Sequence, residues 1–251
     1  MDFDEQLNEM MKKDVTNGSF NKIKLSAAQV QQLCSAIQKK GDAKGLEILW
    51  LESCGLGHEG VKALMAAVTD NGSRLEALRL ANNFIGEEGA KAIAESIPRC
   101  PNLQLLGLAN NSIGETGAKA VAESIPGCPN LQLLGLANNS IGNAGAKALA
   151  ESIPRCPNLR TLYLNNNSIG EAGAKAMAES IPHCPNLQQL YLNNNSIGDA
   201  GAEAVAESIP YCLKLLWLDL SHNNVSPATE VLIDAALKGP RYPPEVLLQH
   251  S

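Results

Sequence analysis

The sequence has no long apolar run, few aromatic residues and no excess of basic residues. Across 251 residues no stretch of about 20 stays apolar, so we expect no membrane-spanning helix. Acidic residues outnumber basic ones by 26 to 20, and the net charge of −6 argues against nucleic acid as a partner. The first residues mix acids and bases where a secretory signal has a basic start and an apolar core, which predicts a cytoplasmic protein.

Patterns typical of catalytic, cofactor and metal sites are also missing. The chain has no glycine-rich phosphate loop and no Cys-x-x-Cys motif, and its four histidines are scattered. We therefore predict that the protein is not an enzyme and has no catalytic residues, no cofactor and no bound metal. Seven cysteines, an odd number, cannot all pair with one another, so we expect buried, reduced thiols. Five of them recur at equal spacing, at Cys100, Cys128, Cys156, Cys184 and Cys212.

This equal spacing belongs to a repeat that fills most of the chain. A block that begins at Leu75 recurs four more times, each copy starting 28 residues after the last. A looser copy covers residues 46–74, another begins at Leu215, and a weak one begins at Phe20. Repeats of this length predict a solenoid, in which stacked units share one apolar core.

The repeats divide the chain into three parts. Residues 20–239 hold eight repeats. Residues 1–19 form an N-terminal helical cap, in which Phe3, Leu7 and Met10 share one helix face. Residues 240–251 form a C-terminal tail, which we expect to be too rich in proline to extend the repeats.

Each unit has the pattern of a strand followed by a helix. In the unit that begins at Leu103, Leu106 and Leu108 have the two-residue spacing of a short strand. Residues 118–125 then carry apolar side chains at helical intervals, and Pro126 ends that helix. Parallel strands lie about 4.8 Å apart, whereas helices need about 10 Å, so the stack must curve. The sequence predicts an α/β solenoid shaped like a horseshoe, with parallel strands on the concave face and helices on the convex face.

The repeated pattern Leu-x-x-Leu-x-Leu-x-x-Asn-x-Ile resembles that of leucine-rich repeats. The 28-residue period and the Gly-x-x-Gly-Ala-x-Ala-x-Ala helices resemble the ribonuclease-inhibitor subtype, which also occurs in Nod-like receptors, Ran GTPase-activating protein and tropomodulins. The resemblance covers about residues 20–240 and implies the fold. It does not imply one function, because this scaffold carries many binding roles.

One asparagine recurs where each strand bends into its loop, and we interpret it as structural. A buried carboxamide at that point can pair with backbone groups that the strand ladder leaves free. Cys54 holds the same position in the unit that begins at Leu46. The column consists of Asn83, Asn111, Asn139, Asn167, Asn195 and Asn223.

The outward-facing strand positions define the candidate site. In Leu-x-x-Leu-x-Leu-x-x the third, fifth and seventh positions face out of the concave sheet, and stacking turns each position into a row. The third-position row is Lys22, Ile48, Ala77, Leu105, Leu133, Thr161, Gln189 and Trp217. The fifth-position row is Lys24, Trp50, Arg79, Gly107, Gly135, Tyr163, Tyr191 and Asp219. The seventh-position row is Ser26, Glu52, Ala81, Ala109, Ala137, Asn165, Asn193 and Ser221.

These rows hold both tryptophans and two of the four tyrosines of the chain. Because aromatic and arginine side chains anchor protein interfaces, we predict that the concave face binds a protein. Its centre is shallow and apolar, with larger side chains on either side. We expect a monomer that binds an unidentified protein, with no nucleic acid and no membrane as partners. The predicted binding residues are Trp50, Arg79, Leu105, Leu133, Tyr163, Tyr191 and Trp217.

Other functions remain open. Ran GTPase-activating protein shares the repeat type, but that family carries an acidic C-terminal tail, and this chain ends in PRYPPEVLLQHS. Ribonuclease inhibition is disfavoured because that family has a longer array and a strongly acidic inner face. The third alternative is a consensus-like scaffold without a ligand, because units 103–130 and 131–158 differ at only four of 28 positions.

Overall fold

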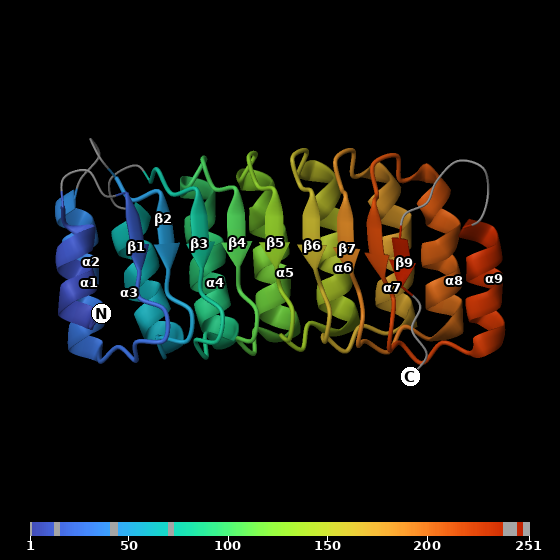
Figure 1. The fold of residues 1–251 in the computed structure, drawn as a ribbon, viewed down its shortest axis with the longest axis horizontal. Coiled ribbons are helices and arrows are strands. Elements are labelled where there is room, and N and C mark those ends of the chain that lie inside the picture. The colour runs from blue at the N-terminus through green and yellow to red at the C-terminus, as the bar shows by residue number, and fades with distance from the viewer. Residues whose placement is uncertain (1, 13–15, 41–44, 70–72, 238–244, 248–251) are drawn as a thin grey trace.

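The computed structural model describes residues 2–12, 16–40, 45–69, 73–237 and 245–247. In this part of the chain, nine parallel strands form one sheet in the order β1 to β9, and a row of helices lies behind it (Figure 1). Each strand therefore pairs with the strand of the next unit. The strands are β1 (Asn17–Ser19), β2 (Ile48–Trp50), β3 (Ala77–Arg79), β4 (Leu105–Gly107), β5 (Leu133–Gly135), β6 (Thr161–Tyr163), β7 (Gln189–Tyr191), β8 (Trp217–Asp219) and β9 (Glu245–Leu247).

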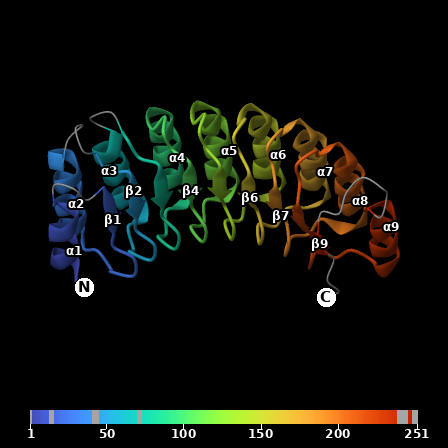
Figure 2. The same cartoon turned by 45° about the horizontal axis from the view of Figure 1, so that its top comes forward.

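The helices run along the other layer of the solenoid. The stack bends into an arc with the strands on the inner side and the helices on the outer side (Figure 2), which confirms the predicted α/β solenoid. The α-helices are α1 (Phe3–Met10), α2 (Ala27–Lys40), α3 (Gly57–Thr69), α4 (Gly86–Ser96), α5 (Gly114–Ser124), α6 (Gly142–Ser152), α7 (Glu171–Ser180), α8 (Gly198–Ser208) and α9 (Pro227–Leu237).

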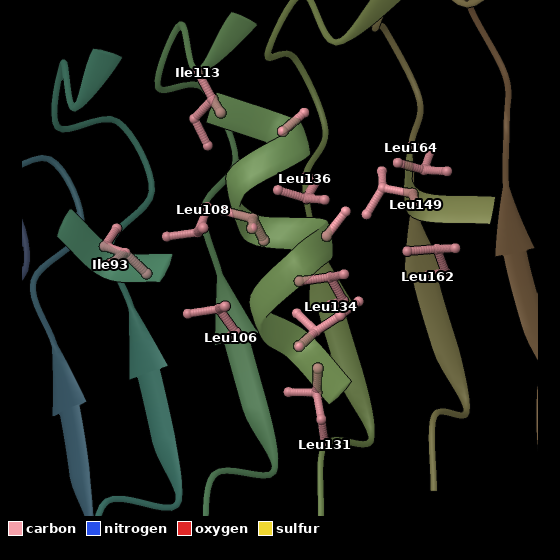
Figure 3. Packing of buried hydrophobic residues seen from close by; sticks show 14 of the residues in the cluster. Ile93, Leu106, Leu108, Ile113, Leu131, Leu134, Leu136, Leu149, Leu162 and Leu164 are labelled. Carbon is pink, nitrogen blue, oxygen red and sulfur yellow. The ribbon is translucent and has the colours of Figure 1, made fainter. Parts of the chain in front are cut away.

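Leucines of neighbouring units meet in one continuous core between the two layers. Leu106 and Leu108 on the strand side are fully buried, and so are Val121 and Ile125 on the helix side (Figure 3 shows the neighbouring leucines). At Ile125 the α-helix gives way to a short 3-10 helix, η3 (Ile125–Gly127), which contains Pro126. Proline therefore ends the helix where the sequence predicts, and the chain returns to the next strand.

Close approach of neighbouring helices explains the second glycine of the helix pattern. A Cβ atom on Gly117 would lie 2.6 Å from Cγ2 of Ile113 and 2.8 Å from Cβ of Ala90 in the preceding helix. Such contacts are too short for real atoms, so a side chain here would push α4 and α5 apart. Glycine at this position sets the spacing of the convex layer.

The asparagine column joins each unit to the next through its side chains. Nδ2 of Asn139 donates to the carbonyl oxygens of Leu108 and Leu136, at 2.9 and 3.0 Å. Oδ1 of Asn139 accepts from the backbone N–H groups of Asn111 and Ile113, at 2.9 and 3.4 Å. Asn139 is itself buried. Its predicted structural role is confirmed, since one side chain serves backbone groups of two successive units.

At the N-terminal end, the helical cap packs on the core, but the predicted register of the first unit is wrong. Phe3 and Met10 of α1 are buried, as expected. The strand β1 lies before Phe20, because Asn17 pairs with Ile48 and the next two residues continue in the same register. The concave positions of β1 are therefore Asn17 and Ser19, and the assignment of Lys22, Lys24 and Ser26 to the three rows was wrong.

A glycine hides this strand in the sequence. Gly18 holds the position of the buried leucine of the pattern, opposite Leu49. A Cβ atom on Gly18 would lie 3.0 Å from Sδ of Met10, so a side chain of the cap helix occupies the space that a leucine fills in other units. The residues Phe20, Ile23 and Leu25 imitate the leucine spacing, which shifted the predicted register by five residues.

At the C-terminal end, the expectation that the tail cannot extend the repeats was also wrong. Strand β9 pairs with β8, and Glu245 lies opposite Trp217, which is 28 residues earlier. The tail therefore keeps the period of the array. Proline has no backbone N–H to donate, but Pro243 and Pro244 precede β9 in the sequence. All three residues of β9 therefore keep their N–H groups for pairing.

The shared core predicts a sharp contrast between inner and outer substitutions. We expect Leu106→Ala or Leu134→Ala to lower the free energy of unfolding by about 2–5 kcal/mol, because each removes a fully buried side chain and leaves a cavity. Lys119→Ala, at an exposed convex position, should cost less than about 0.5 kcal/mol. Denaturant unfolding measures both. Equal losses would contradict the assignment of the two faces.

The asparagine column gives a second contrast, between adjacent residues. Asn139→Ala leaves the buried Asn111 N–H without its acceptor and removes one of the two amide donors to the Leu136 carbonyl, so we expect a loss of about 1–3 kcal/mol. Asn138 is exposed and has a φ of 56°, which glycine adopts freely, so Asn138→Gly is the matched control and should change stability by less than about 0.5 kcal/mol. A larger loss in the control would mean that the column is not what joins the units.

Candidate functional site

Strands β2 to β8 carry all seven of the predicted binding residues at their outward positions. Each of the seven is half-buried, whereas the middle residue of each of these strands is a fully buried leucine. The two-residue alternation of the strands produces this difference. The structure brings the seven into two clusters of side chains and a strip between them.

The first cluster lies at the N-terminal end of the face, on β2 and β3. The guanidinium of Arg79 lies over the ring of Trp50, with the Cζ atom 5.0 Å from the ring centroid. Nη1 of Arg79 is 3.8 Å from Oε1 of Glu52. The positive charge therefore has an aromatic face on one side and a carboxylate on the other, all from the same chain. We call Trp50, Arg79 and Glu52 the arginine cluster.

The second cluster lies at the C-terminal end, on β6, β7 and β8. The rings of Tyr163 and Tyr191 are stacked, with centroids 4.5 Å apart and planes inclined by 15°. The ring of Trp217 follows at 6.3 Å from Tyr191, tilted by 38°. Asp219 pairs in register with Tyr191. We call Tyr163, Tyr191, Trp217 and Asp219 the aromatic cluster.

Contacts within the aromatic cluster hold its groups in place. Oδ1 of Asp219 accepts from the backbone N–H of Ser221 at 3.0 Å and from its hydroxyl at 2.7 Å. Burial raises the pKa of the Tyr191 phenol, and the neighbouring Tyr163 and Asp219 act in the same direction. Tyr191 therefore stays protonated at neutral pH, and the only charge in the cluster is the carboxylate.

Between the clusters lies a strip without charged side chains, on β4 and β5. Leu105 and Leu133 are half-buried at the start of these strands, Gly107 is half-buried at the end of β4, and Gly135 is buried at the end of β5. A Cβ atom on Gly107 would have no neighbour closer than 3.6 Å, and neither glycine has a positive φ. Packing and backbone geometry therefore do not require glycine here. The effect of these glycines is to keep the strip flat.

Both tryptophans have an indole N–H that lacks an acceptor. Nε1 of Trp50 and Nε1 of Trp217 are buried, and neither has a hydrogen-bond partner among the described residues. An unpaired buried donor costs on the order of 1–3 kcal/mol. The ring orientation is therefore set by contacts of the ring faces, with Arg79 and Tyr191 respectively, and not by the N–H group.

The residue pattern predicts the seven large or apolar binding residues but not two carboxylates beside them. Glu52 and Asp219 lie in the predicted rows and are not among the predicted binding residues. The available signal was their position, because each lies on the same face as a tryptophan and two residues from it in the sequence. Their ionic and hydrogen-bond contacts depend on the neighbouring strand or turn, which no repeat pattern specifies.

The cysteine column lies in the core, away from the concave face. All seven cysteines are buried and free. Burial raises the pKa of Cys128 and of Cys184 to about 12, because a thiolate is poorly solvated there. Within the described ranges, no three His, Cys, Asp or Glu side chains gather in a way that suits a metal ion. In the same ranges no helix has both the length and the apolarity needed to cross a membrane.

Comparisons with known proteins agree with the repeat architecture. Residues 157–204 match the family described as Leucine Rich repeats (2 copies), and residues 74–94, 99–122 and 127–150 match the family described as Leucine Rich repeat. A solved structure titled Leiomodin-1 Actin-Binding Site 2 (ABS2) is similar in fold, with a TM-score of 0.50 and 18% sequence identity. That likeness covers 60% of this chain and 86% of the other. No curated protein matches this sequence.

The buried cysteines predict slow thiol chemistry in the native protein. At pH 8 we expect the column of five to react with a thiol reagent far more slowly than a free thiol does, because burial and the raised pKa both suppress the thiolate. All seven should react once the chain is unfolded without a reductant. A colorimetric thiol titration counts them. Fewer than seven would reveal a disulfide and contradict a reduced state.

Proposed function

Because this solenoid is built from leucine-rich repeats, we propose that the protein is a non-catalytic protein-interaction module that binds a partner on its concave face. Domains of this kind are generally interaction modules, since the curved array offers a long surface whose residues vary without disturbing the core. The proposed contacts are the seven predicted residues, together with the carboxylates of Glu52 and Asp219.

One observation carries this proposal: the large rigid side chains of the sheet lie in two clusters on either side of a flat apolar strip. The stacking of Tyr163 on Tyr191 holds both rings before any partner arrives. A preformed anchor loses little conformational entropy on binding, and aromatic anchors dominate interface energies. The strip spans β4 and β5, so a partner can lie flat between Arg79 and Tyr163. The alternative of a consensus-like scaffold without a ligand does not explain why the aromatic side chains gather on this face.

Several finer properties belong to the same proposal. The 28-residue period and the glycine contacts between helices support the ribonuclease-inhibitor subtype. Seven free, buried cysteines support a reducing, cytoplasmic location. We further propose that the chain acts as a monomer, and that residues 1–19 cap the array while residues 20–239 carry the repeats, with the first strand at Asn17–Ser19 as the exception.

Actin is one defined partner to test. The solved structure that shares this fold is named for an actin-binding site. At 18% identity the likeness concerns the fold alone, so actin enters as a probe. Cosedimentation with filamentous actin and binding to monomeric actin would each take one measurement. The alternative of a Ran-type GTPase activator is tested by measuring GTP hydrolysis by the Ran GTPase with and without this chain.

The proposal predicts a separation between binding and stability. We expect alanine at Trp50, Arg79, Tyr163, Tyr191 or Trp217 to weaken partner binding by about 2 kcal/mol or more at the strongest anchors, while the unfolding midpoint stays near that of the native chain. The partner is first captured with the tagged chain from cells that express it and identified by mass spectrometry. Calorimetry with the purified partner then gives the affinity of each variant.

Two further variants sharpen this test. Gly107→Tyr introduces into the flat strip the residue type that β6 and β7 carry in the same row. A Cβ atom at Gly107 meets only ordinary contacts, so this variant should block binding without unfolding the chain. Lys119→Ala on the convex face is the matched control and should bind normally. Unchanged affinity in all the concave variants would rule out the concave face as the binding site.

A further inference from the structure

The arginine cluster shows how this face accommodates a positive charge. Arg79 lies over the ring of Trp50 at 5.0 Å and is 3.8 Å from the carboxylate of Glu52. Trp50 and Arg79 are neighbours in register on β2 and β3, and Glu52 is two residues beyond Trp50. One aromatic ring and one carboxylate thus hold a guanidinium that the next strand supplies. Cation–π attraction and an ion pair act together here.

The aromatic cluster has the same two components, and no described contact supplies a cation. Tyr191 and Trp217 provide ring faces on β7 and β8, with centroids 6.3 Å apart. Asp219 is the register neighbour of Tyr191 and is two residues beyond Trp217. As in the arginine cluster, an acid follows the tryptophan by two residues. Here, however, Asp219 lies in the row that holds Trp50, and the second ring comes from the preceding strand.

The charges around the aromatic cluster favour a positive ligand. The other outward residues of β6, β7 and β8 and of the turns that follow them are neutral, namely Thr161, Asn165, Gln189, Asn193 and Ser221. Nζ of Lys214, at the edge where β8 begins, donates to Oδ1 of Asn186. Arg160, directly before β6, is exposed. Asp219 is the one charged side chain among the outward positions of β6, β7 and β8, and its carboxylate favours a cation there.

We propose that the aromatic cluster is a binding site for an arginine side chain of the partner protein, which stacks on Tyr191 and Trp217 and pairs with Asp219. This inference rests on the proposed function and names the chemistry that the partner must present. Arginine fits better than lysine, because its planar guanidinium covers an aromatic face and still donates to a carboxylate. The arginine cluster combines the same kinds of group, a tryptophan ring, a carboxylate and a guanidinium, within one chain.

The two tryptophans allow a direct test without the partner. Each has one indole N–H, so the protein gives two indole signals in a nitrogen–proton NMR spectrum. The probe is the blocked tripeptide acetyl-Gly-Arg-Gly-amide, and acetyl-Gly-citrulline-Gly-amide is the neutral control of nearly the same shape. The Trp217 signal should shift and saturate with a dissociation constant on the order of 1 mM or above. The Trp50 signal, whose ring Arg79 already covers, should stay in place.

Variants of each cluster complete the design. Asp219→Asn keeps an oxygen that accepts from Ser221 but removes the charge, so the probe should bind about tenfold or more weakly. Arg79→Ala uncovers Trp50 beside Glu52, and the Trp50 signal should then begin to respond to the probe. The citrulline peptide should move neither signal.

Three results would overturn the proposal. They are equal shifts for arginine and citrulline, a response unchanged in Asp219→Asn, and a Trp217 signal that stays fixed with the arginine probe. Arg241, which lies outside the described residues, is checked by Arg241→Ala. A shift that appears only in that variant would mean that the chain's own tail occupies the site. The test uses no partner, so its failure is distinct from a failure of concave-face binding, which the alanine variants measure.

Discussion

The shared carboxamide of the asparagine column is the interaction on which the rest of the structure depends. Asn139 accepts N–H groups of the preceding unit and donates to carbonyls of the preceding unit and of its own. These backbone groups lie where the strands bend away and no ladder can pair them, and burying them unpaired would be costly. By pairing them, the column holds strands about 4.8 Å apart while glycines such as Gly117 fix the wider spacing of the helices. The curvature follows from that difference, and the curvature produces a concave face.

The same alternation separates stability from recognition. Leu106 and Leu134 point into a core that every unit shares, whereas Leu105, Gly107 and their register neighbours point out of it. Outward residues can therefore change from unit to unit at small cost to folding. The outward residues differ at the two ends of the face. At the N-terminal end an arginine contacts one tryptophan and one carboxylate, and at the C-terminal end three aromatic rings lie beside one carboxylate. The uniform units between them keep the face flat.

Most of the fold could be predicted because the period is carried by residues whose role is local. Leucine spacing, the asparagine and the proline after the helix each specify one element of one unit, and stacking repeats the result. The two errors occurred where a long-range contact replaces a local signal. Met10 of the cap helix fills the space at Gly18, so the first strand carries no leucine there. In the tail, pairing with β8 extends the sheet although prolines precede β9, because pairing requires only three backbone residues.

The sequence by itself determined the α/β solenoid, the face on which each residue of β2 to β8 lies, and hence the gathering of both tryptophans, Arg79 and two tyrosines on one surface. Periodicity is enough for this, since an alternation of two assigns every outward residue to a row. Only the tertiary structure decided which neighbours meet within a row. Arg79 turns towards Trp50 and Glu52, Tyr191 stacks on Tyr163, and Asp219 bonds to Ser221. These contacts depend on side-chain torsions and on the distance between adjacent strands, which residue spacing along the chain does not contain.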